Sequence, residues 1–458
     1  MTIVPFIKPS TQSADPAVDA LVEQAVAAHR QIEDWSEERI DALLHALGRV
    51  VADHAHQLAV AAVAETGMGN VRDKTLKNSI AGTGVAARLA DHIGHGQIAF
   101  DRERRVAEIA NPVGVVVGLV PATHPVATFI FKVLIALKGR NAIILSPSRR
   151  ARRVSHHVGG LIQRVLRDAG APTELVQWLG ANSSRATTTA LMSHSDVGMV
   201  LATGGHAMVQ AAYRSGTPAI GVGPGNAPVL ISADADLRHA ARSIVLSKSF
   251  DNGLICGAEN HLVVEASARG RLIAELIQRG AAILTKVESA RFRDAAVSPQ
   301  TNRLLSTIIG QDAAMLARLA NIERPYGIQL LVIPTEIVGT TNYLAAEKLA
   351  PVVSLFEVAD VHEGMRVCRA LLDVDGAGHT AIIHSRSGDL IERFATMPVS
   401  RILVNSPATQ GLLGLTTGLV PSLTLGCGTW GGTSTTNSVT YRDLLNITRV
   451  AYDISDHV

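Results

Sequence analysis

Three residues in the second half of the chain have side chains that can take part in nucleophilic and acid–base catalysis. Cys256 ends the stretch SFDNGLIC (249–256), whose Asn-Gly pair predicts a short polar turn. A thiolate on such a turn is a candidate nucleophile, whereas a free cysteine is otherwise a small buried hydrophobic residue. Glu347 and His379 each precede a predicted strand, where such residues are often only structural. With Cys256 they would supply a nucleophile, a base or cofactor contact, and a proton carrier, but their spacing does not show that they converge.

The composition is that of an ordinary globular protein. The 458 residues are 47% hydrophobic, enough for large buried cores, and the length suggests two or three domains. The 42 basic and 40 acidic residues leave a net charge of +2, which favours neither nucleic acid nor a membrane surface as a partner. Three scattered cysteines form neither a disulfide framework nor paired zinc ligands, which is typical of a reducing compartment. We expect a soluble, cytoplasmic protein without a metal site.

The amino-terminal part predicts helices that carry no motif. Residues 1–14 are expected to form an extended arm, and Asp15 is a candidate N-cap followed by Pro16. Apolar residues then recur at helical spacing. The predicted helices cover residues 16–35, 36–63 and 71–89.

From residue 106 the pattern changes to short apolar runs that alternate with helix-length segments. This alternation is typical of βαβ units with buried parallel strands, and a second such series follows Cys256. We predict an α/β protein with two doubly wound, Rossmann-like domains. Because ligands bind at the carboxyl ends of such strands, four turns are candidate binding segments. They are PATHP (121–125), SPSRRA (146–151), ATGGH (202–206) and GVGPGN (221–226).

A basic cluster adjoins the second of these turns. If Ser148 caps the following helix, Arg149 and Arg150 occupy its first turn, where the helix dipole disfavours cations by several tenths of a kcal/mol. A bound phosphate would reverse that penalty, while the alternative is a solvated basic face. Neither standard phosphate-binding fingerprint, GxGxxG after a strand or GxxxxGK[ST], is present.

Four blocks, in this order, resemble the aldehyde dehydrogenase superfamily and in particular its coenzyme A-acylating branch, which contains acylating acetaldehyde and propionaldehyde dehydrogenases. The resemblance extends from about residue 16 to about residue 450. The blocks are FKVLIALKGRNAIILSPSRRA (131–151), ATGGHAMVQAAYRSGTPAIGVGPGNAPVLI (202–231), SKSFDNGLIC (247–256) and SLTLGCGTWGGTS (422–434).

The resemblance implies a division of the chain. Residues 1–230 would form the nicotinamide cofactor-binding domain with its helical amino-terminal part, and residues 231–415 the catalytic domain that carries the cysteine. Residues 416–458 would return to the cofactor domain and to a small oligomerisation element. A homodimer or homotetramer is therefore expected.

The resemblance also implies roles for the candidate catalytic residues. Cys256 would attack an aldehyde to give a thiohemiacetal, and loss of hydride to the nicotinamide would leave a thioester on Cys256. The Cys256 N–H and a group from the turn at Thr123 would stabilise the oxyanion, although this chain has His124 where acylating relatives commonly have asparagine. Glu347 matches a residue that holds the nicotinamide ribose, and His379 matches one near the thioester.

Further residues are expected to bind the cofactor by the same resemblance. Arg149 replaces a glutamate that hydrolytic relatives use at the adenosine ribose, so NADP, or the phosphates of coenzyme A in a shared pocket, are alternatives to NAD. The expected cofactor-binding set, besides Glu347, is Ser146, Pro147, Ser148, Arg149, Gly204, Gly205, Val222 and Gly223.

Val222 decides the expected second substrate. It stands where hydrolytic relatives carry the glutamate that activates water, and a valine takes up no proton. A thiol needs less activation, so coenzyme A would release the acyl group, assisted by His379. We predict an oxidoreductase that reversibly converts a small aldehyde, coenzyme A and NAD(P)+ into acyl-CoA and NAD(P)H.

Two alternatives and the aldehyde itself stay open at this point. The alternatives are a hydrolytic aldehyde dehydrogenase that gives a free carboxylate and a non-catalytic scaffold subunit. Acetaldehyde, propionaldehyde, sulfoacetaldehyde and succinate semialdehyde all fit the prediction. Some relatives enter bacterial microcompartments through an amphipathic amino-terminal helix, which we do not expect in residues 1–14.

Overall fold

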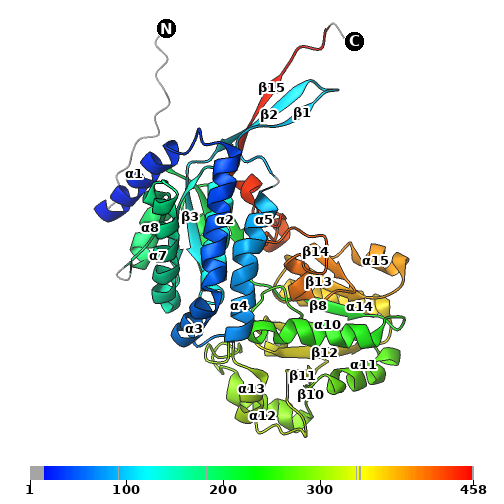
Figure 1. Cartoon of the computed structure of the whole chain (residues 1–458). Coiled ribbons are helices and arrows are strands. Elements are labelled where there is room, and N and C mark those ends of the chain that lie inside the picture. Colours follow the sequence, from blue (N-terminus) through cyan, green and yellow to red (C-terminus); the bar gives the residue numbers. More distant parts are fainter. Residues whose placement is uncertain (1–14, 91, 181–182, 337, 340–341, 456–458) are drawn as a thin grey trace. The chain divides into compact units, whose positions relative to one another are not determined.

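The computed structural model describes residues 15–90, 92–180, 183–336, 338–339 and 342–455. The expected arm at residues 1–14 therefore lies outside the described residues. The chain divides into two compact units, which we describe one at a time, and Figure 1 shows their elements coloured along the sequence. The first unit consists of Met1–Thr66, Lys74–Gly221 and Val439–Val458, and the second of Gly67–Asp73 and Val222–Ser438.

A five-stranded sheet in the order β5-β4-β3-β6-β7 forms the centre of the first unit. The pairs β3–β4, β3–β6 and β4–β5 are parallel, so the carboxyl ends of these strands lie at one edge. The buried Lys132 ties two of these ends together, because its Nζ donates to Leu119 O and to Leu201 O at 2.7 Å each. The strands are β3 (Val115–Val120), β4 (Ala142–Pro147), β5 (Val176–Trp178), β6 (Val197–Thr203) and β7 (Ala219–Val222).

The helices of the first unit follow the predicted order with three differences. The first helix ends at Arg30, and the second predicted helix is two helices that break at His54. The third predicted helix contains a π-helical turn, η1 (Ile80–Gly84), which packs on α2. The approach is so close that a Cβ on Gly48 would lie 2.8 Å from Gly82 O. The helices are α1 (Pro16–Arg30), α2 (Glu37–Asp53), α3 (Ala55–Thr66), α4 (Val71–Ser79), α5 (Val85–Leu89), α6 (Pro125–Lys138), α7 (Arg152–Asp168), α8 (Arg185–Met192) and α9 (His206–Tyr213).

A small antiparallel sheet also belongs to the first unit and extends from it as an arm (Figure 1). It consists of β1 (Gly96–Asp101), β2 (Val106–Pro112) and β15 (Leu445–Ala451), with β2 in the middle. The exposed Phe100 and Tyr452 rings contact each other edge to face, with ring centroids 6.2 Å apart. The sheet thus presents aromatic side chains to solvent.

A seven-stranded parallel sheet in the order β10-β11-β12-β9-β8-β13-β14 forms the second unit. Alternate residues of each strand enter different hydrophobic clusters. Val229 and Ile231 of β8, for example, belong to one cluster, whereas Leu230 between them belongs to another. Both faces of the sheet are therefore buried, which is why these strands are nearly continuous apolar runs.

The second series predicts strands near residues 261–265, 281–285, 329–333, 352–357, 380–384 and 401–404, and all six are present, each within two residues of these limits. With the sheets of the first unit, they confirm the predicted α/β class with two doubly wound units. The strands are β8 (Pro228–Ile231), β9 (His261–Glu265), β10 (Ala281–Ile283), β11 (Leu330–Pro334), β12 (Val352–Val358), β13 (Gly378–His384) and β14 (Val399–Val404). The helices are α10 (Leu237–Ser249), α11 (Ala266–Gln278), α12 (Lys286–Ala296), α13 (Ala313–Leu319), α14 (Val361–Val374), α15 (Gly388–Phe394) and α16 (Ala408–Leu412).

Candidate active site

Four neighbouring strands of the second unit bring the candidate catalytic residues to one edge of the sheet. β12, β9, β8 and β13 are adjacent and parallel, so their amino ends lie side by side. Glu347 precedes β12, Cys256 precedes β9, Gly225 precedes β8, and His379 stands at the start of β13. The three candidate catalytic residues therefore lie at the amino ends of these strands, as expected from their positions before predicted strands.

The turn before Cys256 has an unusual backbone. Asp251, Asn252 and Gly253 all have positive φ angles, of 47°, 56° and 73°, in a region that non-glycine residues rarely adopt. Side chains hold this conformation: Asp251 N donates to the Asp73 carboxylate at 2.8 Å, and Asn252 Nδ2 donates to Gly310 O at 2.9 Å. The predicted polar turn is confirmed, and it is fixed by residues distant in sequence.

Cys256 and His379 form a direct pair. Cys256 Sγ lies 3.2 Å from His379 Nε2, and His379 Nδ1 lies 2.9 Å from Thr380 Oγ1. Burial, with the charge of Arg401, lowers the pKa of His379 to about 3, so the imidazole is neutral at physiological pH. A neutral ring that donates from Nδ1 to the hydroxyl leaves Nε2 as the acceptor for the thiol proton.

The thiol of Cys256 is protonated in the ligand-free protein. Burial raises its pKa to about 12, with further contributions from Glu347 and Cys427, and Arg401 opposes them. The residue as a whole is partly exposed, but its thiol group is surrounded by protein atoms and loses most of its solvation. The resting pair is therefore a neutral thiol beside a neutral imidazole, and not a preformed thiolate–imidazolium pair.

Arg401 fixes the strand that carries His379. Its guanidinium is 5% exposed and donates from Nη2 to His379 O at 3.1 Å and to Gly426 O at 2.5 Å. The arginine thus joins the start of β13 to the Gly- and Thr-rich segment that contains Cys427. Sequence reasoning missed Arg401, although a charged residue inside the apolar run VSRILV is a signal for a buried arginine with a specific task.

Glu347 contacts the loop that packs on Cys256. Its Oε1 accepts a hydrogen bond from Gly225 N at 3.0 Å. A Cβ on Gly225 would lie 1.8 Å from Cys256 O, so only glycine permits this approach. Burial raises the pKa of Glu347 to about 8 in spite of the opposing Gly225 N–H and Lys248. The carboxyl group is therefore largely protonated at neutral pH.

Two further buried groups lie in this electrostatic environment and were not predicted. Burial lowers the pKa of Lys248 to about 8 against the opposing charges of Glu259 and Glu347. Burial raises the pKa of Glu259 to about 7, although its Oε1 accepts from Ala408 N at 2.8 Å. Both residues flank the nucleophile in sequence, which was the available signal.

The predicted residues of the first unit lie at the carboxyl ends of adjacent strands. Thr123 follows β3, Ser146 lies near the end of β4, and Gly204 follows β6. Two buried lysines hold the turn after β3. Lys74 Nζ donates to Thr123 O at 3.0 Å, and Lys77 Nζ lies 2.7 Å from His124 Nδ1. The structure thus shows a main-chain contact for Thr123, which accepts through its carbonyl oxygen.

The predicted place of the arginine cluster was wrong. Ser148 Oγ accepts from Arg150 N at 3.4 Å, but the residues after it form a 3₁₀ turn (Arg149–Ala151), and α7 begins only at Arg152. The amino end of α7 receives a carboxylate of the protein itself, because Glu65 accepts from the N–H groups of the second and third helical residues at 2.9 Å and 2.8 Å. Arg149 lies in the 3₁₀ turn and is exposed, and its contact with a cofactor phosphate stays a prediction.

A different helix end fits a phosphate group. Gly205 is the N-cap of α9 and supplies no side-chain cap, so the first amides of that helix keep their donor capacity. A Cβ on Gly205 would meet no atom within 4 Å, which leaves open space beside it. Ser146 Oγ, on β4, which is separated from β6 by β3, lies 3.1 Å from Thr188 Oγ1. The donor set at this edge suits a dinucleotide pyrophosphate.

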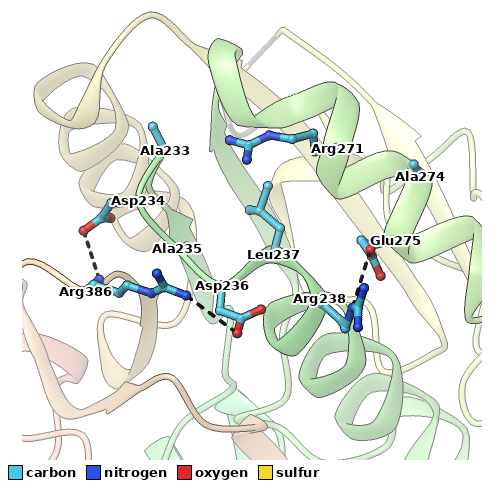
Figure 2. A pocket seen from close by; sticks show the side chains of 10 residues that line it. All are labelled: Ala233, Asp234, Ala235, Asp236, Leu237, Arg238, Arg271, Ala274, Glu275 and Arg386. Carbon is cyan, nitrogen blue, oxygen red and sulfur yellow. Dashed lines mark hydrogen bonds and ion pairs between the residues drawn. The ribbon is translucent and has the colours of Figure 1, made fainter.

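A surface pocket of about 700 Å³ lies elsewhere in the second unit, between the start of α10 and the facing α11 (Figure 2). Two ion pairs lie in it, since Arg386 lies 3.8 Å from the Asp236 carboxylate and Arg238 lies 4.0 Å from that of Glu275. Neither Cys256 nor any other candidate catalytic residue lines it. In the described residues no helix is long and apolar enough to span a membrane, and no cluster of three metal-ligating side chains is found there.

Comparison with known proteins agrees with this geometry. A family model described as the aldehyde dehydrogenase family matches residues 6–419. The chain is 36% identical over 442 residues to the succinate-semialdehyde dehydrogenase (acetylating) of Clostridium kluyveri, with 96% of each chain covered. It is 37% identical over 440 residues to the bifunctional aldehyde-alcohol dehydrogenase of Escherichia coli, covering 95% of this chain and 49% of that protein.

The fold is also that of solved relatives. The crystal structure of an acetylating aldehyde dehydrogenase from Geobacillus thermoglucosidasius matches with a TM-score of 0.92 and 39% identity, over 96% of both chains. The chain spans about half the length of the bifunctional relatives that it matches and nearly all of the acetylating ones. The model match and these identities show that the chain belongs to the aldehyde dehydrogenase family.

Proposed function

We propose that the chain oxidises a small aldehyde to an acyl-CoA, with coenzyme A as the acyl acceptor and NAD or NADP as the hydride acceptor. The observation that carries this proposal is the contact of 3.2 Å between Cys256 Sγ and His379 Nε2. The resemblance adds that Val222, at the end of β7, takes the place of the water-activating glutamate of hydrolytic relatives. The acetylating relative from Clostridium kluyveri, which matches along its full length, supports the same chemistry.

The first step follows from the neutral resting pair. As Cys256 Sγ attacks the aldehyde carbon, its proton passes to His379 Nε2, the unprotonated ring nitrogen. Because the low pKa of His379 makes the protonated ring a strong acid, the ring then passes this proton on to solvent. Thr380 Oγ1 keeps the ring in the required tautomer by accepting from Nδ1. The Cys256 N–H is assigned to the developing oxyanion. A second donor at Thr123 stays a prediction.

A bound nicotinamide would serve as the hydride acceptor. Loss of the hydride would turn the thiohemiacetal on Cys256 into a thioester. We assign the pyrophosphate to Gly204 and Gly205, on the uncapped amino end of α9. Glu347 is assigned to the nicotinamide ribose. The roles of Ser146, Pro147, Ser148, Arg149, Val222 and Gly223 in cofactor binding stay predictions.

The release step distinguishes this proposal from hydrolysis. Once His379 is neutral again, the coenzyme A thiol attacks the thioester on Cys256, His379 Nε2 accepts the thiol proton, and the Cys256 thiolate that leaves takes this proton up to restore the resting thiol. Val222 is a buried residue at the end of β7 and cannot activate water. One thioester replaces another, so the step is close to balanced in free energy and the overall reaction is reversible.

The experiment follows nicotinamide reduction at 340 nm with a panel of aldehydes, with and without coenzyme A, and identifies the product by mass spectrometry. We expect acyl-CoA and turnover only with the thiol present, and Cys256→Ala should abolish both. Full turnover without coenzyme A, giving a carboxylate, would establish the hydrolytic alternative. No turnover with any aldehyde or acyl-CoA would favour the scaffold.

Other properties stay predictions. They are the NAD or NADP preference, the aldehyde, the cytoplasmic location, the assignment of residues 1–230, 231–415 and 416–458 to separate roles, and assembly as a homodimer or homotetramer. The exposed aromatic side chains of the β1-β2-β15 sheet support assembly through that element.

A further inference from the structure

A buried carboxamide fixes the chain on both sides of Glu347. Asn260 is 2% exposed and lies in the segment between Cys256 and β9. Its Oδ1 accepts from Lys348 N at 3.2 Å, and its Nδ2 donates to Ala346 O at 2.9 Å. These two backbone groups belong to the residues immediately before and after Glu347, so one side chain sets the main chain that presents the carboxyl group.

The same carboxamide holds the loop that Glu347 contacts. Asn260 Nδ2 also donates to Asn226 Oδ1 at 2.5 Å, and Asn226 Nδ2 donates to Ala345 O at 2.9 Å. Asn226 follows Gly225, whose N–H donates to Glu347 Oε1. The contacts thus join the nucleophile segment, the Glu347 segment and the Gly225 loop.

Only a carboxamide can serve these contacts together. The group needs one acceptor for a backbone N–H and two N–H donors for two oxygens, which an amide supplies in one plane. Aspartate has the same shape, but it would place an acceptor, and a charge, against both of those oxygens. Asn260→Asp therefore changes the hydrogen bonding with little change in volume.

We propose that Asn260 is a positioning residue for Glu347. It keeps the carboxyl group of Glu347 on the Gly225 N–H and thereby keeps the Gly225 loop packed against the carbonyl of Cys256. The inference rests on the proposed function in one respect, that Glu347 meets a nicotinamide nucleotide.

The test is nucleotide binding, followed by the fluorescence of the bound reduced cofactor without aldehyde or coenzyme A. Asn260→Asp should weaken binding about tenfold, because it removes two buried hydrogen bonds and sets carboxylate oxygen against Ala346 O and Asn226 Oδ1. Because the effect passes through Glu347, the double variant Asn260→Asp/Glu347→Gln should bind no more weakly than Glu347→Gln alone. Additive losses in this cycle, or unchanged binding by Asn260→Asp, would overturn the inference.

A matched control comes from the first unit. Asn141 is fully buried and has the same pattern, accepting from Gly114 N at 2.9 Å and donating to Leu444 O at 3.0 Å, at the amino end of β3. Asn141→Asp should lower the melting temperature comparably but leave nucleotide affinity within about twofold. An equal loss of affinity in this control would mean that Asn260 acts through general stability.

The outcomes separate the inference from the proposed function. If Asn260→Asp does not fold, Asn260→Ala takes its place, with an expected loss of about threefold to tenfold. A wild-type protein that binds the nucleotide but forms no acyl-CoA refutes the proposed function. The nucleotide affinities of wild type and the Asn260 variants can still be compared in that case. A wild-type protein that binds neither NADH nor NADPH would overturn both.

Discussion

The carboxyl group of Glu347 should control the reactivity of Cys256 only at alkaline pH. Glu347 is one of the groups that raise the pKa of Cys256 to about 12, and its own pKa is raised to about 8 by burial. Below that value Glu347 is protonated and uncharged, so Glu347→Gln changes little. Above it the wild-type carboxylate opposes thiolate formation and the glutamine does not.

The size of the effect follows from the thiol. At neutral pH a pKa of about 12 in place of 9.0 leaves roughly a thousandfold less thiolate. A more basic thiolate is more nucleophilic, by roughly 16- to 32-fold over this interval, so alkylation of ligand-free Cys256 should be about 30- to 60-fold slower than that of an ordinary thiol. By the same reasoning, each pKa unit that Glu347→Gln removes should accelerate alkylation about threefold.

Iodoacetamide labelling, with the Cys256 peptide quantified by mass spectrometry, measures both quantities. Rates for wild type and Glu347→Gln should agree near pH 6.5 and diverge by about threefold or more near pH 9.5, on either side of the Glu347 pKa of about 8. The buried Cys368 serves as an internal control. An equal acceleration at both pH values, or wild-type alkylation as fast as that of free cysteine, would refute the reasoning.

Three further predictions concern the framework. Lys132→Met leaves two buried strand carbonyls without their donor and should cost about 2–4 kcal/mol of unfolding free energy in urea; a loss below about 1 kcal/mol would contradict it. Gly225→Ala places a Cβ 1.8 Å from Cys256 O, so the loop must move and kcat should fall at least about tenfold, and a wild-type kcat would be the contrary result. The Arg324 guanidinium, with contacts of 2.8 Å and 3.0 Å, holds the pKa of Glu288 at about 2, below its ordinary value of 4.5. The stability that this pair adds is present above pH 4.5 and is lost as the pH falls towards 2. In thermal melts, Glu288→Gln should therefore lower stability by about 1–2 kcal/mol at neutral pH and by much less near pH 3. A loss of stability that does not depend on pH would contradict this prediction.

Local patterns were sufficient for the elements of the fold. The buried strands are continuous apolar runs because helices cover both faces of the sheets. The alternation of such runs with helix-length segments predicted the strands after Cys256. The helix predictions failed where close packing, and not local sequence, decides the backbone. Gly48 and Gly82 meet so closely that the helix between residues 71 and 89 contains a π-helical turn, which no single-segment pattern records.

The helix-end argument for the arginine cluster failed for a related reason. Ser148 and the arginines predicted an anion at the start of a helix, and an anion is present there. It is Glu65, which approaches from α3 and lies far away in the sequence. A local charge pattern can show that a partner is needed, but only the packing of two helices decides which group supplies it.

By itself, the sequence determined the α/β class and the residue types of a cysteine nucleophile with Glu347 and His379. It could not show that they meet, because residues so far apart in the chain come together only through the order of strands. The tertiary structure decided this, because β12, β9, β8 and β13 are neighbours in a parallel sheet. Parallel strands start at the same edge of the sheet, so the segments that precede these four strands lie together there. The structure also decided the protonation states, because burial, which raises the pKa of Cys256 and lowers that of His379, depends on packing and not on residue type.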